Sequence, residues 1–370
     1  MVLLLLSMMQ STSLFSSSQS LRQSPEQKQS GGGGIIYKPA RTEQYIYEHA
    51  NGTLGYNLDF PETCKIWKDP NVTNPKTHSD LVAYGNDVDA HKEALENFQH
   101  IPDLLESIKK ADNYESKKDI CKTARPHPEG LKALFPSNQL SSLLSSDSAA
   151  ASQYIEPILP PMRSHHFCQK RHPSLMLLDY LVHDFEAMCL KLKPTSKRIL
   201  IDMGASLNFH SSGAQPIVEL MQLYEKFGFN FDHIYAFERD QKDPNNVLGK
   251  QLPEKYLPSY HWMNVGVSAE EGHRFNPLHS IVKAFDEDDL IVVKLDIDTP
   301  HIELPLVKEL LEDKDGVYGK LVDQFYFEYH VRMGDMAGYW GRKNVKDSVM
   351  DSIELFRGLR EKGIPAHFWP

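Results

Sequence analysis

Several titratable side chains in this sequence stand directly after apolar runs, where a parallel sheet would expose them at its edge. Asp202 and Glu238 each end such a run, Asp296 and Asp298 follow another, and His330 follows a third. A carboxylate that ends a wholly apolar strand is more often functional than structural, because burying it is costly. We therefore interpret these five residues as candidates for a functional site.

The spacing of these residues limits the chemistry they could perform. Asp296 and Asp298 are two residues apart, as are Glu328 and His330, so each pair lies on one side of a strand if that strand continues. Four such ligands could hold a divalent cation, or His330 could act as a general base near neutral pH. The simpler interpretation, a hydrogen-bonded polar rim around a cofactor, is favoured over a metal site.

The elements that would position these residues alternate along the second half of the chain. Short apolar runs predict strands, and apolar residues at helical spacing predict helices between them. The expected strands are 198–202, 233–238, 260–267, 290–296, 324–329 and 364–369, and the expected helices are 173–194, 216–228, 300–311 and 349–363. This alternation predicts an α/β fold with a doubly wound, mostly parallel sheet.

In such a sheet the ligand binds beyond the carboxyl ends of the strands, where the strand order reverses. Glu238 at the end of the second strand suits a ribose, because a carboxylate accepts hydrogen bonds from vicinal hydroxyls. The sequence lacks the G-x-G-x-x-G turn that a dinucleotide pyrophosphate needs. S-adenosylmethionine carries no phosphate, so it is compatible with a turn that has fewer glycines.

The motifs in these strands resemble a known family. In order along the chain they are Ile201-Asp-Met-Gly-Ala205, Ile234-Tyr-Ala-Phe-Glu238, Asn264-Val-Gly-Val-Ser268 and Val293-Lys-Leu-Asp296. Together they are similar to the successive motifs of FkbM-type S-adenosylmethionine-dependent methyltransferases. The resemblance spans roughly residues 175–335.

The resemblance implies a class I methyltransferase fold, S-adenosylmethionine as methyl donor, and a hydroxyl of a small molecule or glycan as acceptor. It implies that Asp202 and Gly204 shape the methionine pocket and that Glu238 holds the ribose. Asp296 would face the transfer site. Ala205 and Ser268, which end the first and third motifs, complete the expected cofactor site. Asp298 and His330 join Asp296 as expected catalytic residues.

The amino-terminal part of the chain has a different composition. An apolar run at residues 1–9 and a Ser/Gly-rich stretch predict a targeting segment and flexible linker over 1–34. We expect a partly helical accessory segment over 35–162, with a helix around 89–110 and a loop near 141–162. The methyltransferase-like domain is then expected over 163–370.

Composition excludes some classes of function. A net charge of -10 argues against general nucleic-acid binding, and no apolar run is long enough for a transmembrane helix. Cys64 and Cys121 could bridge in an oxidising compartment, whereas Cys189 is expected to be a small buried hydrophobic residue. The apolar amino terminus favours the secretory pathway or an organelle, with the cytoplasm as the alternative.

Two other functions stay open from the sequence. Asp296 and Asp298 form a D-x-D pattern that could hold a divalent cation and the diphosphate of a nucleotide-sugar, as a glycosyltransferase requires. The chain could also be a methyltransferase-like binding module without activity. Binding of S-adenosylmethionine would separate the first alternative from the methyltransferase, and turnover would separate the second.

Overall fold

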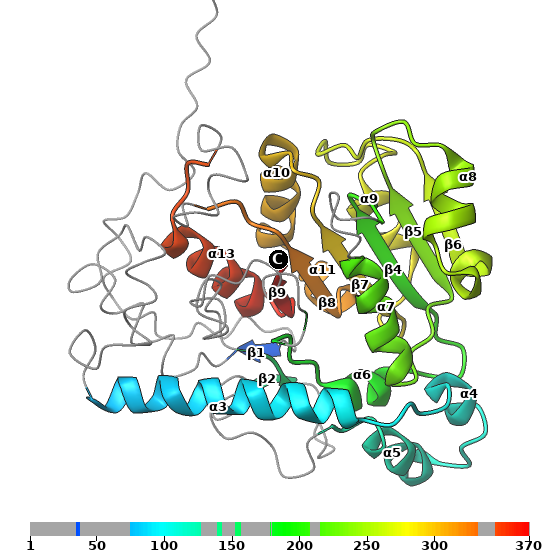
Figure 1. Ribbon diagram of the computed structural model, residues 1–370, viewed down its shortest axis with the longest axis vertical. Coiled ribbons are helices and arrows are strands. Elements are labelled where there is room, and N and C mark those ends of the chain that lie inside the picture. Colours follow the sequence, from blue (N-terminus) through cyan, green and yellow to red (C-terminus); the bar gives the residue numbers. More distant parts are fainter. Residues whose placement is uncertain are drawn as a thin grey trace, which may run out of the picture. The chain divides into compact units, whose positions relative to one another are not determined.

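The computed structural model describes residues 35–37, 75–126, 139–142, 152–156, 178, 180–207, 215–331 and 345–369 (Figure 1). The chain divides into two units between Gly33 and Gly34, and every described residue belongs to the second, Gly34–Pro370. The expected targeting segment therefore lies outside the described residues, and so does Cys64.

A six-stranded, all-parallel sheet forms the centre of the second unit (Figure 1). Its strand order is β6-β5-β4-β7-β8-β9, so the chain winds outward from β4 in one direction and from β7 in the other. The strands are β4 (Arg198–Met203), β5 (His233–Phe237), β6 (Tyr260–Met263), β7 (Leu290–Leu295), β8 (Gln324–Phe327) and β9 (Ala366–Phe368). This topology confirms the expected doubly wound α/β fold, and its order reverses between β4 and β7.

The two central strands show why the sequence folds this way. Every residue of β4 and of β7 is buried, as expected for a strand covered on both faces, and Ile201 pairs with Val293 in the middle of the ladder. Alternate side chains then enter two separate apolar cores. Ile199 and Ile201 belong to one core, and Leu200 belongs to the other.

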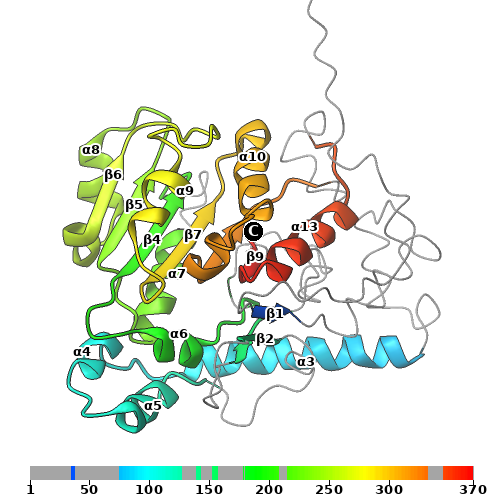
Figure 2. The same ribbon diagram turned by 180° about the vertical axis from the view of Figure 1, so that it is seen from behind.

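Helices cover both faces of the sheet (Figures 1 and 2). On one face lie α10 (Pro300–Leu311) and α13 (Val349–Glu361), with the short helices α9 (Pro277–Ser280) and α11 (Tyr318–Leu321). On the other face lie α6 (Phe185–Lys191) and α7 (Pro216–Lys226). Short helical turns complete the β5–β6 and β6–β7 connections; these are α8 (Pro244–Asn246), Val247–Gln251, Glu254–Ser259 and Val282–Ala284.

The expected helix over 173–194 is wrong for most of its described length. Residues 180–184 are not helical, and α6 begins only after Asp184, whose side chain accepts a hydrogen bond from the Ala187 N–H. The backbone N–H of Val182 donates instead to the carboxylate of Glu156, at 3.0 Å. A distant side chain therefore takes a bond that the helix would have made.

The expected helix around 89–110 is divided. It is replaced by α3 (Pro75–Asn97) and α4 (Leu104–Ile108), and α5 (Tyr114–Lys122) follows. Pro102 disfavours helical geometry in the residue before it, and Asp103 then caps α4 through the Glu106 N–H. The break therefore has a local cause that apolar spacing did not reveal.

The expected loop near 141–162 contains strand residues at both of its described ends. β1 (Ile35–Tyr37), β2 (Gln139–Ser142) and β3 (Ser152–Tyr154) form a small antiparallel sheet in the order β1-β2-β3. β2 and β3 are mostly polar and β1 is only three residues long, so none of them gives the alternating pattern that predicts a strand.

The pairing of the cysteines differs from the expectation. Cys121 in α5 and Cys189 in α6 form a disulfide, and both are fully buried. The prediction that Cys189 is simply a small buried hydrophobic residue is therefore wrong. The bond links the accessory segment covalently to a helix packed on the central sheet. Among the described helices, none combines the length and apolar character needed to cross a membrane.

Candidate functional site

The backbones after β4 and β7 meet where the strand order reverses. Gly204 follows β4 with a φ of +92°, and a Cβ there would lie 1.6 Å from the carbonyl oxygen of Asp296. The N–H groups of Gly204 and Ala205 both donate to the Phe237 carbonyl oxygen, at 3.0 and 2.8 Å. The turn is therefore fixed between two neighbouring strands, and only glycine fits at 204.

A buried lysine joins two of the expected site residues. Lys294 Nζ lies 3.1 Å from Asp202 Oδ1 and 3.2 Å from Asp296 Oδ2, and it donates to the Gly204 carbonyl oxygen at 3.0 Å. We call Asp202, Lys294 and Asp296 the Lys294 triad. Asp202 is completely buried, and neither of its oxygens accepts a well-aligned hydrogen bond from the described residues.

Burial and charge act in opposite directions in this triad. Burial raises the pKa of Asp202 and outweighs the lowering effect of the Lys294 ammonium. For Lys294, burial lowers the pKa, but the carboxylates of Asp202 and Asp296 outweigh it and the net shift is upward. Lys294 therefore stays charged, and its ammonium group is a fixed cation in contact with the Gly204 turn.

Trp369, which follows β9, also holds Asp296. Its indole Nε1–H donates to Asp296 Oδ2 at 3.1 Å, and its ring centroid lies 5.7 Å from Lys294 Nζ. The sequence reasoning missed both Lys294 and Trp369. A lysine inside the apolar run 290–295 is a signal that could have been used, because lysine is almost never buried unless it is paired. Nothing in the sequence pointed to Trp369.

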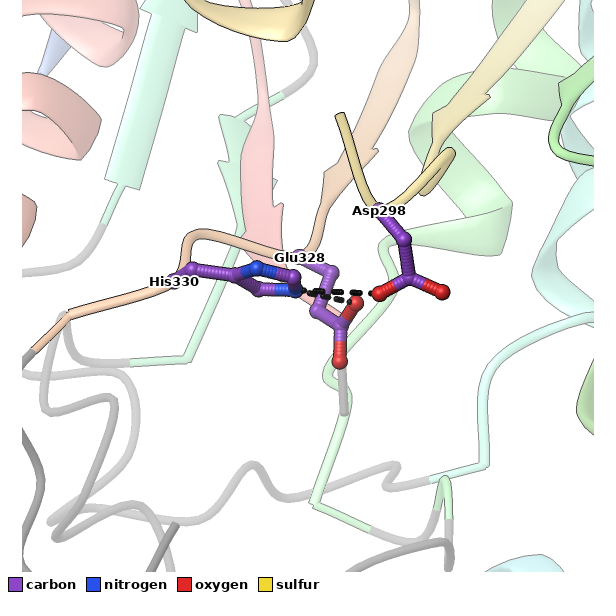
Figure 3. A group of neighbouring side chains, drawn as sticks. All are labelled: Asp298, Glu328 and His330. Carbon is purple, nitrogen blue, oxygen red and sulfur yellow. Dashed lines mark hydrogen bonds and ion pairs between the residues drawn. The ribbon is translucent and has the colours of Figure 1, made fainter. Parts of the chain in front are cut away.

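Three further side chains lie close together at the same edge of the sheet, after β7 and β8 (Figure 3). His330 Nε2 lies 2.9 Å from Glu328 Oε2 and 3.5 Å from Asp298 Oδ1. Glu328 and His330 are buried, whereas the side chain of Asp298 is 71% exposed. We call these three residues the imidazole cluster.

The Asp296-x-Asp298 pair does not act as a unit. β7 ends at Leu295, and Asp298 has a φ of +52°, so the strand does not continue through the pair. The condition under which both carboxylates would lie on one side of the strand, that the strand continues through them, is therefore not met. Asp296 contacts Lys294 and Trp369 and also shares a hydrogen bond with the side chain of Glu328, while Asp298 lies beside His330.

Two buried glutamates, Glu328 within this cluster and Glu303 next to it, are hard to ionise. Burial raises the pKa of Glu303 in α10 to about 7, although its Oε1 accepts a hydrogen bond from the Ile297 N–H at 2.9 Å. Burial also raises the pKa of Glu328 well above its ordinary value, and the carboxylates of Asp296 and Asp298 add to this effect. Carboxyl groups with such shifts are concentrated at functional sites.

The remaining expected cofactor residues lie on the β5 and β6 side of the reversal point. Glu238 directly follows β5 and is partly exposed; its Oε1 accepts from the Asp240 N–H at 2.7 Å. Its Oε2 accepts no hydrogen bond from the residues that the structure describes, so it can receive one from a ligand. Ser268 Oγ accepts from the Glu270 N–H in a local turn at 3.2 Å. Ser268 therefore serves its own turn, apart from the Lys294 triad.

Comparison with known proteins adds no further information about this site. No protein-family model, no curated protein and no solved structure matches the chain.

Proposed function

We propose that the chain is a class I S-adenosylmethionine-dependent methyltransferase that methylates a hydroxyl of a small molecule or glycan. One observation supports this most directly. The Gly204 turn closes on Asp296 at the point where the strand order reverses, and Glu238 ends the next strand. In a doubly wound sheet this is the position of a nucleoside ligand, with the carboxylate placed for the ribose hydroxyls.

The chemistry of these side chains fits the donor. S-adenosylmethionine carries a positive sulfonium and an ammonium group. Among the described residues of this edge, the carboxyl groups of Glu238, Asp296 and Asp298 are at least partly exposed, whereas Asp202 is completely buried and paired with Lys294. The partly exposed Glu238 would accept the two ribose hydroxyls. Gly204 and Ala205 would bring the backbone against the methionine part.

In this proposal the bound donor supplies an electrophilic methyl group, and the residues of the chain orient and deprotonate the acceptor. Asp298 is exposed and its Oδ1 lies 3.5 Å from Nε2 of the buried His330, so an acceptor hydroxyl that enters from solvent would reach Asp298 first and His330 beyond it. Asp296 is held by Lys294 and Trp369 and would face the transfer site from the opposite side. Its fixed position favours an orienting role.

An equilibrium binding measurement tests the proposal. We expect S-adenosylmethionine and S-adenosylhomocysteine to bind the purified chain in calorimetry and to raise its melting temperature. UDP-glucose and GDP-mannose with Mn²⁺ should do neither. The reverse pattern would favour the glycosyltransferase alternative. Binding without methyl transfer to any hydroxyl in an acceptor panel would leave the inactive binding module.

We also propose that the protein works in an oxidising compartment such as the secretory pathway. The buried Cys121–Cys189 disulfide supports this, because such bonds are rare in reducing compartments. Thiol alkylation of the protein isolated from its native source, under denaturing conditions, tests it. Two alkylated thiols at Cys121 and Cys189 without prior reduction would contradict the proposed compartment.

A further inference from the structure

The imidazole cluster brings together three donors of two chemical kinds from two separate strand ends. Asp298 comes from the turn after β7, and Glu328 and His330 follow β8; in Figure 3 the two carboxylates point toward the same imidazole nitrogen. The ligand atoms of the three residues all lie within 4.8 Å of one another. The fold thus brings Asp298 close to Glu328 and His330, which are 30 and 32 positions later in the sequence.

The two separations from His330 Nε2, one of them a hydrogen bond to Glu328, are also close to those between ligands of one metal ion. Ligands about 2.1 Å from a cation lie about 3.0 Å apart when they are adjacent in an octahedron and about 3.4 Å apart in a tetrahedron. The observed separations from His330 Nε2 are 2.9 Å to Glu328 Oε2 and 3.5 Å to Asp298 Oδ1. A small movement of the side chains would therefore give normal metal–ligand distances.

The adjoining Lys294 triad, whose Asp296 shares a hydrogen bond with Glu328, offers a comparison within the same edge. There, two carboxylates that the fold brings together are bridged by a cation, the Lys294 ammonium, at 3.1 and 3.2 Å. In the imidazole cluster a ring nitrogen occupies the corresponding position between two carboxylate oxygens. That nitrogen can carry a proton or ligate a metal, whereas the lysine can do only the former.

We propose that Asp298, Glu328 and His330 bind one first-row divalent cation, such as Mn²⁺, through two carboxylates and one imidazole. The imidazole favours a cation of this kind over Ca²⁺ and Mg²⁺, which prefer oxygen ligands. Glu328 and His330 form the buried side of the site. The exposed Asp298 leaves the other side open to water or to an oxygen of the acceptor. This inference goes beyond the proposed function, because cation binding does not require the methyl donor.

Direct titration with Mn²⁺ alone tests the proposal. The full chain is freed of metal with a chelator, and the fall of the free Mn²⁺ signal in electron paramagnetic resonance is followed as protein is added. We expect one saturable site per chain. Asp298→Asn and His330→Gln should each weaken binding by more than about tenfold, a loss that even outer-shell changes at metal sites can cause.

The matched control is Glu354→Gln, which removes a half-buried carboxylate with a raised pKa from α13, away from the imidazole cluster. It should bind Mn²⁺ as the unmodified chain does. Asp298 is exposed, so Asp298→Asn should fold, and circular dichroism checks this. Absence of saturable binding, or equal binding by the control and both ligand variants, would overturn the proposal. In either case the imidazole cluster would be an internal ion-pair group.

Discussion

Two buried clusters in this molecule contain glutamates, but only one of them surrounds its glutamate with cationic and hydrogen-bonding partners. In the first, which we call the Glu156 cluster, the carboxylate of Glu156 is bonded to His367, Arg360 and the Val182 N–H. His367 also contacts Gln324 Oε1 at 2.5 Å. In the second, at the edge of the sheet, Glu303 and Glu328 lie among other carboxyl groups.

The difference is visible in the pKa values. For Glu156, burial raises the pKa, but His367 and Arg360 outweigh it and lower the pKa to about 2. For Glu303, burial prevails and raises the pKa to about 7. The Glu156 cluster is therefore satisfied and contributes to stability. The edge retains two buried carboxyl groups that are costly to ionise, an arrangement that a fold tolerates chiefly where a ligand or a reaction requires it.

The largest expected effect comes from breaking the satisfied cluster. Glu156→Gln should lower the free energy of unfolding at pH 7 by about 3–5 kcal/mol, because the buried Arg360 loses its charged partner. The stabilisation from Glu156 should be complete above its ordinary pKa of 4.5 and should disappear as the pH falls toward 2. Denaturant unfolding between pH 2 and pH 7 measures both. An unchanged stability at pH 7 would show that the Glu156 cluster is not structural.

Loss of the disulfide should lower stability without affecting the edge of the sheet. Reduction, or the paired change Cys121→Ala and Cys189→Ala, should cost about 2–4 kcal/mol, because a loop with a sequence separation of 68 residues is released in the unfolded state. Once folded, the variant should bind S-adenosylhomocysteine as before, since the bond lies among the structural helices α5 and α6. A large loss of ligand affinity in a folded variant would contradict the separation of the two regions.

Replacing Glu303 should raise the free energy of unfolding, whereas the two changes above lower it. Below pH 4.5 Glu303 is protonated in both the folded and the unfolded chain, so it does not change the free energy of unfolding. As the pH rises from 4.5 to 7 the unfolded chain releases this proton more easily, and the free energy of unfolding falls by up to about 3 kcal/mol. Glu303→Gln can still accept from the Ile297 N–H and should remove this loss. Its unfolding free energy should therefore exceed that of the unmodified chain at pH 8 and equal it at pH 4. Destabilisation at pH 8 would place Glu303 with the structural carboxylates.

The sequence predicted the central sheet well because its strands carry their own signal. Continuous apolar runs such as 290–295 identify buried parallel strands, and Pro300 and Leu311 bound α10 as expected. The failures occurred where distant residues decide local structure. The Val182 N–H bonds to Glu156 rather than within a helix, and the polar strand β2 depends on its pairing with β1 and β3.

The candidate site shows the same limit. Strand-end position was enough to select Asp202, Asp296 and His330, because the carboxyl ends of parallel strands share one edge. It could not show that Asp296 and Asp298 separate, since a positive φ at Asp298 turns the chain away. Nor could it place Trp369 against Asp296, a contact between residues 73 positions apart.

The most direct test of the central claim, that this edge binds the nucleoside of a methyl donor, is the affinity of Glu238→Ala for S-adenosylhomocysteine. Calorimetry should show a loss of about 1.5–3 kcal/mol, roughly 10- to 150-fold in the dissociation constant, because charge-assisted hydrogen bonds to the ribose are removed. The control Glu219→Ala removes an exposed carboxylate from α7 and should bind normally. An unchanged affinity in folded Glu238→Ala, or no binding by the unmodified chain, would contradict the claim.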